Sequence, residues 1–281
     1  MAILSALYCY PVKSCRGVAL TEATLDARGI LHDREFLIVD ADDRFITQRA
    51  VPVLALIGTA ITAEALVLRN PAGAEFSLPW QPAAGGGAPA RRTVTVWSST
   101  LLADDMGDEV AAWLGDTVGQ RCRLVRIGAE SRREVPAMRV PAGFPAADES
   151  GPALSFPDGY PLLVVSEESL LHLNQQLPGD PLPMDRFRPN LVVSGCAYPH
   201  EEDDWRTYRI GDARLWSANP CERCVVTTTD QQTLRRDREP LHTLSRYRRA
   251  PDGGSVIFGQ NVVHGSPGAT LRVGEPVEVL A

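Results

Sequence analysis

Short apolar segments rich in Val, Ile, Leu and Thr recur along the chain and are separated by Gly, Pro, Asn and Asp. This pattern is typical of β-strands joined by turns, because branched side chains suit a pleated backbone and the separating residues favour turns. Strands are predicted at residues 36–39, 60–68, 93–97, 122–127, 162–165, 191–194, 224–229 and 256–263. The hydrophobic pattern therefore predicts a β-rich α+β protein.

Three peripheral helices are predicted beside these strands. The first begins at a cap provided by Asp104 or Asp105 and ends at Gly115. The second begins at Ser166 and carries its leucines on roughly one side. The third opens with Pro240 in its first turn, where the missing N–H of proline is tolerated.

Two segments interrupt the apolar rhythm. Residues 81–92 are rich in Gly, Ala and Pro and are predicted to form a mobile loop inserted within a domain. Residues 128–161 accumulate prolines, which indicates a long functional loop or a crossing between domains. We place the domain boundary near the start of this second segment, which divides the chain into residues 1–127 and 128–281.

Composition narrows the functional classes. The chain has 281 residues, 44% of them hydrophobic, and a formal net charge of −7 with Lys and Arg scattered, so nucleic acid is not an expected partner. The first residues have neither a basic leader nor an apolar run of membrane-spanning length. Six cysteines without an export signal are expected to be reduced thiols. We expect a cytoplasmic protein that does not enter a membrane.

A Cys-x-x-Cys pair, Cys221 and Cys224, is the first candidate for chemistry. Structural zinc needs four ligands, and no second such pair or ligand-spaced histidine pair is present. A thioredoxin-like pair begins a helix, whereas Cys224 precedes a strand-like run. Cys224, beside Arg223, is suited to bind one soft or borderline metal that has other ligands. The alternative for both cysteines is a small buried apolar side chain, and Cys221 is closer to that alternative.

Three further polar segments are candidates. Lys13, Ser14 and nearby backbone amides can hold an anion, and an exposed turn is the alternative. Arg188 offers a planar fork for phosphate or carboxylate, and Asn190 can both donate and accept, unless they form a surface turn. The acidic run at residues 201–204 is interpreted as a solvated loop, with a metal site or docking patch as alternatives.

Seven segments, taken in order, resemble the MOSC family. They resemble in particular its two-part members with an N-terminal MOSC β-barrel domain, the group that contains the amidoxime-reducing components and their bacterial relatives. The segments are YPVKSCRG at 10–17, HDREFLIVD at 32–40, PDGYPLLVVSEESL at 157–170, FRPNLVVSG at 187–195, EDDW at 202–205, PCERCVVTTTD at 220–230 and FGQNVV at 258–263. The resemblance implies a MOSC β-barrel-like domain preceded by an N-terminal β-barrel-like domain.

The resemblance also implies a molybdenum cofactor. It implies that Cys224 is the molybdenum ligand. The groups that it implies around the pterin and its phosphate are Lys13, Ser14, Arg34, Arg188 and Asn190. Glu222 differs from the small polar residue expected between the two cysteines and places a carboxylate near an anionic cofactor. Pyridoxal phosphate is not expected, because no Schiff-base lysine is recognisable and Lys13 is the only lysine.

The activity that the resemblance implies is reduction of N-hydroxylated or N-oxygenated small molecules. The chain has neither an iron–sulfur cysteine set nor a flavin fingerprint, so electrons are expected from a separate ferredoxin, flavodoxin or cytochrome-type protein. Two alternatives remain open. One is a molybdenum-cofactor or sulfur carrier without reductase activity, and the other is a thiol redox protein that uses Cys221 and Cys224.

Overall fold

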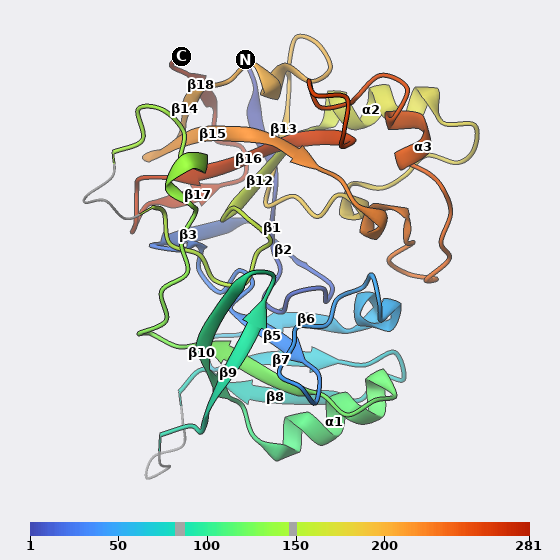
Figure 1. Ribbon diagram of the computed structural model, residues 1–281. Helices are drawn as coiled ribbons and strands as arrows, with labels where there is room; N and C mark the ends of the chain where they lie inside the picture. The colour runs from blue at the N-terminus through green and yellow to red at the C-terminus, as the bar shows by residue number, and fades with distance from the viewer. Residues whose placement is uncertain (82–87, 146–150) are drawn as a thin grey trace.

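The computed structural model describes residues 1–81, 88–145 and 151–281. Strands dominate it, and three α-helices lie among the described residues. A large sheet occupies one half of the molecule, and smaller sheets with α1 (Asp108–Val118) occupy the other; both chain termini lie on the side away from α1 (Figure 1). The predicted β-rich fold class is confirmed.

The large sheet has eight strands. Their order across the sheet is β18 (Val277–Val279), β14 (Thr207–Ile210), β15 (Ala213–Glu222), β16 (Ile257–His264), β12 (Leu162–Ser166), β13 (Leu191–Ser194), β1 (Ile3–Cys9) and β2 (Val18–Leu20). β12 and β13 pair in parallel, while the other neighbours are antiparallel. All five residues of β12 are buried, and its apolar run at residues 162–165 is typical of a strand covered on both faces.

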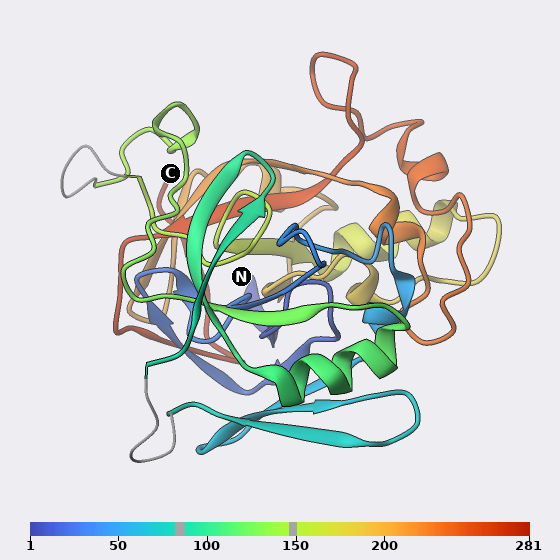
Figure 2. The same ribbon diagram turned by 60° about the horizontal axis from the view of Figure 1, so that its bottom comes forward.

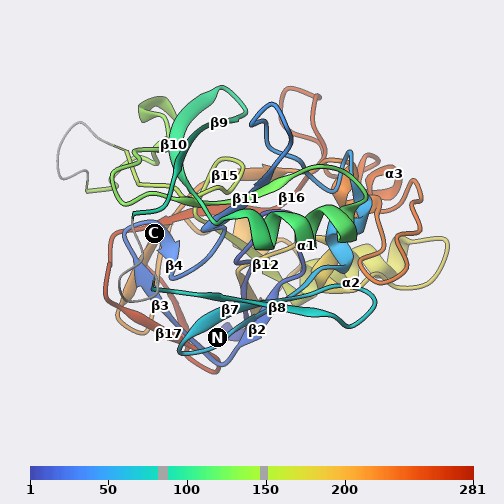
Figure 3. The same cartoon turned by 90° about the horizontal axis from the view of Figure 1, so that it is seen from below.

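Three smaller sheets accompany the large one in the part of the chain that the structure describes. One is formed by β17 (Thr270–Arg272), β3 (Glu22–Asp26) and β4 (Gly29–Ile30), and shares an apolar core with the large sheet. A four-stranded sheet follows the order β5 (Phe36–Val39), β11 (Arg123–Ile127), β10 (Ser99–Asp105) and β9 (Arg91–Val96). The last contains β6 (Gly58–Ile61), β7 (Ala65–Arg69) and β8 (Glu75–Pro79). Helix α1 lies between β11 and this sheet, and buries Val110 and Leu114 (Figures 2 and 3).

The remaining helices are short. α2 (Glu167–Gln176) begins after Ser166, whose Oγ accepts the backbone N–H of Ser169 at 3.1 Å, which confirms the predicted N-cap. α3 (Leu241–Leu244) is a single turn that begins after Pro240. The 3-10 helices are η1 (Pro52–Leu56), η2 (Ala137–Arg139), η3 (Met184–Arg186), η4 (Glu201–Asp203) and η5 (Val225–Thr228).

The predicted limits of the first helix were wrong at both ends. Asp104 and Asp105 belong to β10, and Asp105 accepts hydrogen bonds from Arg123 and from the backbone of Gly107. The helix continues through Gly115 and ends where Gly119 adopts a left-handed φ of 77°. Glycine takes this conformation at the least steric cost because it has no Cβ, so Gly119 is suited to end the helix here.

Two strand predictions need correction. Residues 60–68 belong to two antiparallel strands, β6 and β7, because the Thr62 hydroxyl accepts the Ala65 N–H and closes a turn between them. The run after Cys224 forms the 3-10 helix η5 rather than a strand. Its Thr227 and Thr228 hydroxyls donate to carbonyls three residues earlier, a local bond that competes with strand pairing.

The acidic run at residues 201–204 is not simply a solvated loop, because Glu202 is fully buried. Its carboxylate accepts hydrogen bonds from the backbone N–H of Ser166 and from the hydroxyls of Ser166 and Ser169. These donors explain how a carboxylate is accommodated inside the protein. The residue ties η4 to the junction of β12 and α2.

The interrupting segments and the domain boundary are only partly described. Residues 82–87 of the predicted mobile loop lie outside the described residues, and its last residues, Arg91 and Arg92, begin β9. The boundary between residues 1–127 and 128–281 stays a prediction. β1 and β3 pair with β13 and β17, so the start of the chain shares sheets with its end. Among the described residues no helix is both long and apolar enough to cross a membrane.

Candidate functional site

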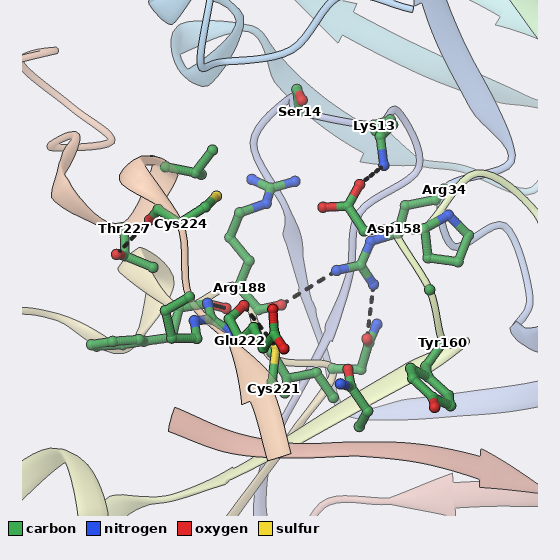
Figure 4. Close-up of a pocket in the computed structure, with 18 of the residues that line it drawn as sticks. Lys13, Ser14, Arg34, Asp158, Tyr160, Arg188, Cys221, Glu222, Cys224 and Thr227 are labelled. Carbon is green, nitrogen blue, oxygen red and sulfur yellow. Dashed lines mark hydrogen bonds and ion pairs between the residues drawn. The ribbon is translucent and has the colours of Figure 1, made fainter. Parts of the chain in front are cut away.

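One pocket collects side chains from distant parts of the chain. All six residues that sequence analysis singled out line it, together with Glu222 (Figure 4). The six are Lys13, Ser14, Arg34, Arg188, Asn190 and Cys224. Further lining residues include Arg49, Asp158 and Thr227.

Lys13 is buried and paired with Asp158. Its Nζ donates to an Asp158 carboxylate oxygen at 2.5 Å and to the backbone oxygen of Phe156 at 2.8 Å. Burial lowers the pKa of Lys13, although Asp158 partly counteracts this effect. Burial would raise the pKa of Asp158, but Lys13 outweighs it and holds that pKa well below its ordinary value. Trp97 also donates to Asp158, at 3.1 Å.

Asp33, Arg34 and Asn190 form a closed polar network. Arg34 donates to the Asp33 carboxylate at 2.5 Å and to the Asn190 amide oxygen at 2.8 Å. Asn190 in turn donates to Asp33 at 3.0 Å and to the Tyr8 carbonyl at 3.1 Å. Burial by itself would lower the pKa of Arg34. The attraction of the Asp33 carboxylate is stronger than this effect of burial, so the pKa of Arg34 is raised. Asn190 therefore positions Arg34. Because its side chain is buried, Asn190 does not form the surface turn that was the alternative interpretation.

The ring of Tyr10 supports both arginines. The guanidinium carbons of Arg34 and Arg188 lie 4.5 Å and 4.2 Å from its centroid, a cation–π arrangement. Gly17 packs so closely that a Cβ there would lie 2.5 Å from the ring. The Tyr10 hydroxyl donates to the Pro189 carbonyl at 3.1 Å, so the ring is fixed on the segment that carries Arg188.

Three pocket residues have left-handed backbone conformations. Ser14, Arg34 and Arg188 have φ angles of 70°, 46° and 54°. Non-glycine residues take this conformation at a cost of roughly 1–3 kcal/mol, and such residues cluster at ligand sites. Their coincidence in one pocket supports a functional role for it.

The Cys-x-x-Cys pair lies where β15 ends and η5 begins. Cys221 packs beside the apolar cluster that contains Phe187 and Phe258, and its sulfur accepts a hydrogen bond from Arg223 at 2.9 Å. Cys224 precedes η5, is partly exposed, and extends toward the same space as Arg188 (Figure 4). The two cysteines are free thiols, and only Cys221 is tied to an apolar core.

The electrostatics of the pocket are predominantly positive. Two carboxylates, Asp158 and Glu222, face five cationic side chains, which belong to Lys13, Arg34, Arg49, Arg188 and Arg223. No group of three or more His, Cys, Asp or Glu side chains suited to a metal ion occurs in the described residues. A metal bound at Cys224 would therefore need ligands supplied by a cofactor or by water. The arrangement suits an anion held beside one free cysteine.

Sequence reasoning missed two acidic residues of this site. Asp33 and Asp158 lie inside segments already singled out, at residues 32–40 and 157–170. Asp33 directly precedes Arg34, and Asp158 belongs to the proline-rich loop predicted to be functional. Their partners are set by folding, because Lys13 and Asp158 are 145 positions apart.

A strand-rich fold brings a free thiol and clustered cations together in one pocket, which has the chemical groups that an anionic ligand needs. Two protein families match the chain. The family described as "MOSC N-terminal beta barrel domain" matches residues 1–121, and the family described as "MOSC domain" matches residues 152–278. The chain belongs to the MOSC family and carries both of its domains. The family predicted from the sequence motifs is confirmed.

Named relatives match nearly the whole chain. Mitochondrial amidoxime-reducing component 1 of Mus musculus is 34% identical over 289 residues, which cover 99% of this chain and 82% of the relative. The human protein of the same name is 32% identical with the same coverage. Molybdenum cofactor sulfurase of Oryza sativa subsp. japonica is 32% identical over 98% of this chain and 35% of that protein. These relatives associate the chain with molybdenum-cofactor proteins.

Proposed function

We propose that the chain binds the molybdenum cofactor in this pocket and reduces N-hydroxylated or N-oxygenated small molecules. The observation that carries the proposal is the convergence of Cys224 with a set of cations from both ends of the chain. The names of the amidoxime-reducing relatives support the reaction class.

The donor set fits such a cofactor. A molybdopterin carries an anionic phosphate and a metal-binding dithiolene, so it needs cations at one end and an open metal position at the other. Arg188 has five N–H donors, and within the described residues only one is bonded, to the Cys15 carbonyl at 2.8 Å. Arg188 is therefore free to bind an anion while Tyr10 holds its plane.

Each residue then has a distinct task. Lys13, Ser14, Arg34 and Arg188 would hold the pterin and its phosphate, with Asn190 orienting Arg34. The Cys224 thiolate would be the protein ligand of molybdenum. When bound, the cofactor supplies the two-electron chemistry that removes oxygen from nitrogen. A separate donor protein of the ferredoxin, flavodoxin or cytochrome type would supply the electrons.

Metal analysis of protein made in a cofactor-producing host tests the proposal. We expect molybdenum and pterin in the purified chain, and loss of most molybdenum in Cys224→Ser. Cys221→Ser is the matched control, because this cysteine is held by the apolar cluster and by Arg223. Equal molybdenum retention by wild type and Cys224→Ser would refute the assignment. Inactivation by Cys221→Ser with molybdenum retained would instead favour a thiol redox protein.

A carrier of the cofactor or of sulfur is the second candidate. The observation that favours it is the match to the molybdenum cofactor sulfurase. Reduction of benzamidoxime by the molybdenum-loaded chain, with a reduced viologen dye as donor, separates the two functions. Failure to reduce benzamidoxime despite bound metal would favour the carrier.

We also propose that the protein works in the cytoplasm. All six cysteines are free thiols in the structure, a state that a reducing compartment maintains. Cell fractionation with an antibody against the chain tests this location, and recovery in an exported or membrane fraction would contradict it.

A further inference from the structure

Two segments of the pocket wall are joined by arginines that donate in opposite directions. Arg186 donates from its Nε to the backbone carbonyl of Thr227 at 2.9 Å. Arg223, on the other segment, donates from its guanidinium to the backbone carbonyl of Phe187 at 2.6 Å. Each segment therefore supplies one donor and one acceptor. We call this reciprocal pair of hydrogen bonds the arginine clamp.

The arginine clamp holds the chain on both sides of Cys224. Arg223 directly precedes Cys224, and Thr227 follows it by three residues. The N–H and the hydroxyl of Thr227 both donate to the Cys224 carbonyl, at 3.1 Å and 3.0 Å (Figure 4). The bond from Arg186 to Thr227 therefore holds the turn that begins at Cys224.

The arginine clamp also holds the group at the anion-binding end of the pocket. Arg188 directly follows Phe187, and its guanidinium lies 4.2 Å from the centre of the Tyr10 ring. Arg188 and Cys224 extend toward the same space (Figure 4). The clamp thus connects a residue that suits an anion to the residue that would bind the metal. Groups that are held in place before a ligand enters lose less conformational entropy when it binds.

Arg186 itself lies behind the pocket rather than in its lining. Its side chain is only 5% exposed, and one terminal nitrogen lies 3.6 Å from the Asp230 carboxylate. A buried guanidinium is costly unless its N–H groups are bonded. Arg186 bonds its Nε–H to Thr227, and Thr227 bonds to Cys224. The buried charge is therefore linked to the pocket through backbone carbonyls.

We propose that Arg186 is a positioning residue, which fixes Cys224 relative to Arg188 through the arginine clamp. This inference rests on the proposed function, because Arg188 and Cys224 belong to the two ends of the same cofactor site. Arg186 acts on the protein alone, before any ligand is bound. The clamp can therefore be tested in the full chain made without cofactor.

Alkylation of Cys224 by two reagents of different charge tests the clamp. Iodoacetate is an anion and iodoacetamide is neutral, so the ratio of their rates reports positive charge near the thiol. Trypsin releases residues 224–235, in which Cys224 is the only cysteine, and mass spectrometry of this peptide follows that thiol alone. We expect the ratio to fall about threefold in Arg186→Met, the effect of removing one unit charge from several ångströms away in water.

Two controls isolate the positioning effect. Arg28→Met is the matched control, because Arg28 is partly buried and donates to two backbone carbonyls away from the pocket. Its ratio should equal that of wild type. Arg188→Met separates positioning from the charge of Arg186 itself. If Arg186 acts by placing Arg188 beside Cys224, adding Arg186→Met to Arg188→Met should leave the ratio unchanged.

An unchanged or higher ratio in Arg186→Met overturns the inference, as does an equal fall with and without Arg188. If tryptophan fluorescence shows that Arg186→Met does not fold, Arg186→Lys takes its place with the same criteria. Lysine keeps the charge and replaces the planar fork with a single nitrogen, so the ratio should again fall. A chain that retains no molybdenum refutes the proposed function, while the alkylation ratio still decides whether the clamp positions Cys224.

Discussion

Replacing Asn190 with alanine should destabilise the protein by about 3 kcal/mol. The Asn190 side chain is buried and makes three hydrogen bonds, one to the neutral Tyr8 carbonyl and two to the charged groups of Asp33 and Arg34. A neutral bond contributes about 1 kcal/mol, and a bond to a charged group about 1.5–3 kcal/mol. The sum is reduced because the bonds share one side chain and the remaining groups can rearrange.

Asn174→Ala is the matched control for this experiment. Asn174 is partly buried, and among the described residues its side chain bonds only to neutral backbone groups, the N–H and carbonyl of Leu182. Its loss should cost about 1–2 kcal/mol. Unfolding in urea, followed by tryptophan fluorescence, measures both variants against wild type. If Asn190→Ala costs no more than Asn174→Ala, the charged bonds of the Asp33–Arg34–Asn190 network do not stabilise the fold, and our reasoning is refuted.

Two further predictions concern the buried polar groups beside α2. Glu202→Ala should lower the free energy of unfolding by about 3 kcal/mol, because the Ser166 N–H and the hydroxyls of Ser166 and Ser169 lose their acceptor. Asp204 is exposed, so the control Asp204→Ala should lower it by less than about 1 kcal/mol. Urea unfolding measures both, and equal costs would contradict the role of the buried carboxylate. Burial, with a smaller effect of Arg248, lowers the pKa of His200 to about 3, so the unfolded chain binds a proton that the folded chain excludes. The free energy of unfolding should therefore fall as the pH drops below about 6.5. In thermal melts, His200→Phe should lose less stability than wild type between pH 6.5 and pH 4. Equal losses in the two proteins would argue against a contribution from His200.

Much of the strand pattern was predictable from the sequence, because strands and caps depend on local residue choice. The apolar runs at β5, β12, β13 and β16 were located closely, and the Ser166 cap was identified from its own side chain. Prediction failed after Cys224, where threonine hydroxyls bond to nearby carbonyls and support a 3-10 turn in a β-branched run. Composition alone does not distinguish these two uses of threonine.

The site was predictable in its members but not in its connections. Ordered motifs identified Lys13, Ser14, Arg34, Arg188, Asn190 and Cys224 as candidates, and the structure places them around one pocket.

Their connections depended on the tertiary fold. That fold paired Lys13 with Asp158 and enclosed Arg34 between Asp33 and Asn190. The sequence by itself determined the strand-rich character and the chemical groups available. Only the tertiary structure decided which charges neutralise one another and which, like that of Glu222, have no partner among the described residues. Such pairing depends on contacts between segments far apart in the chain.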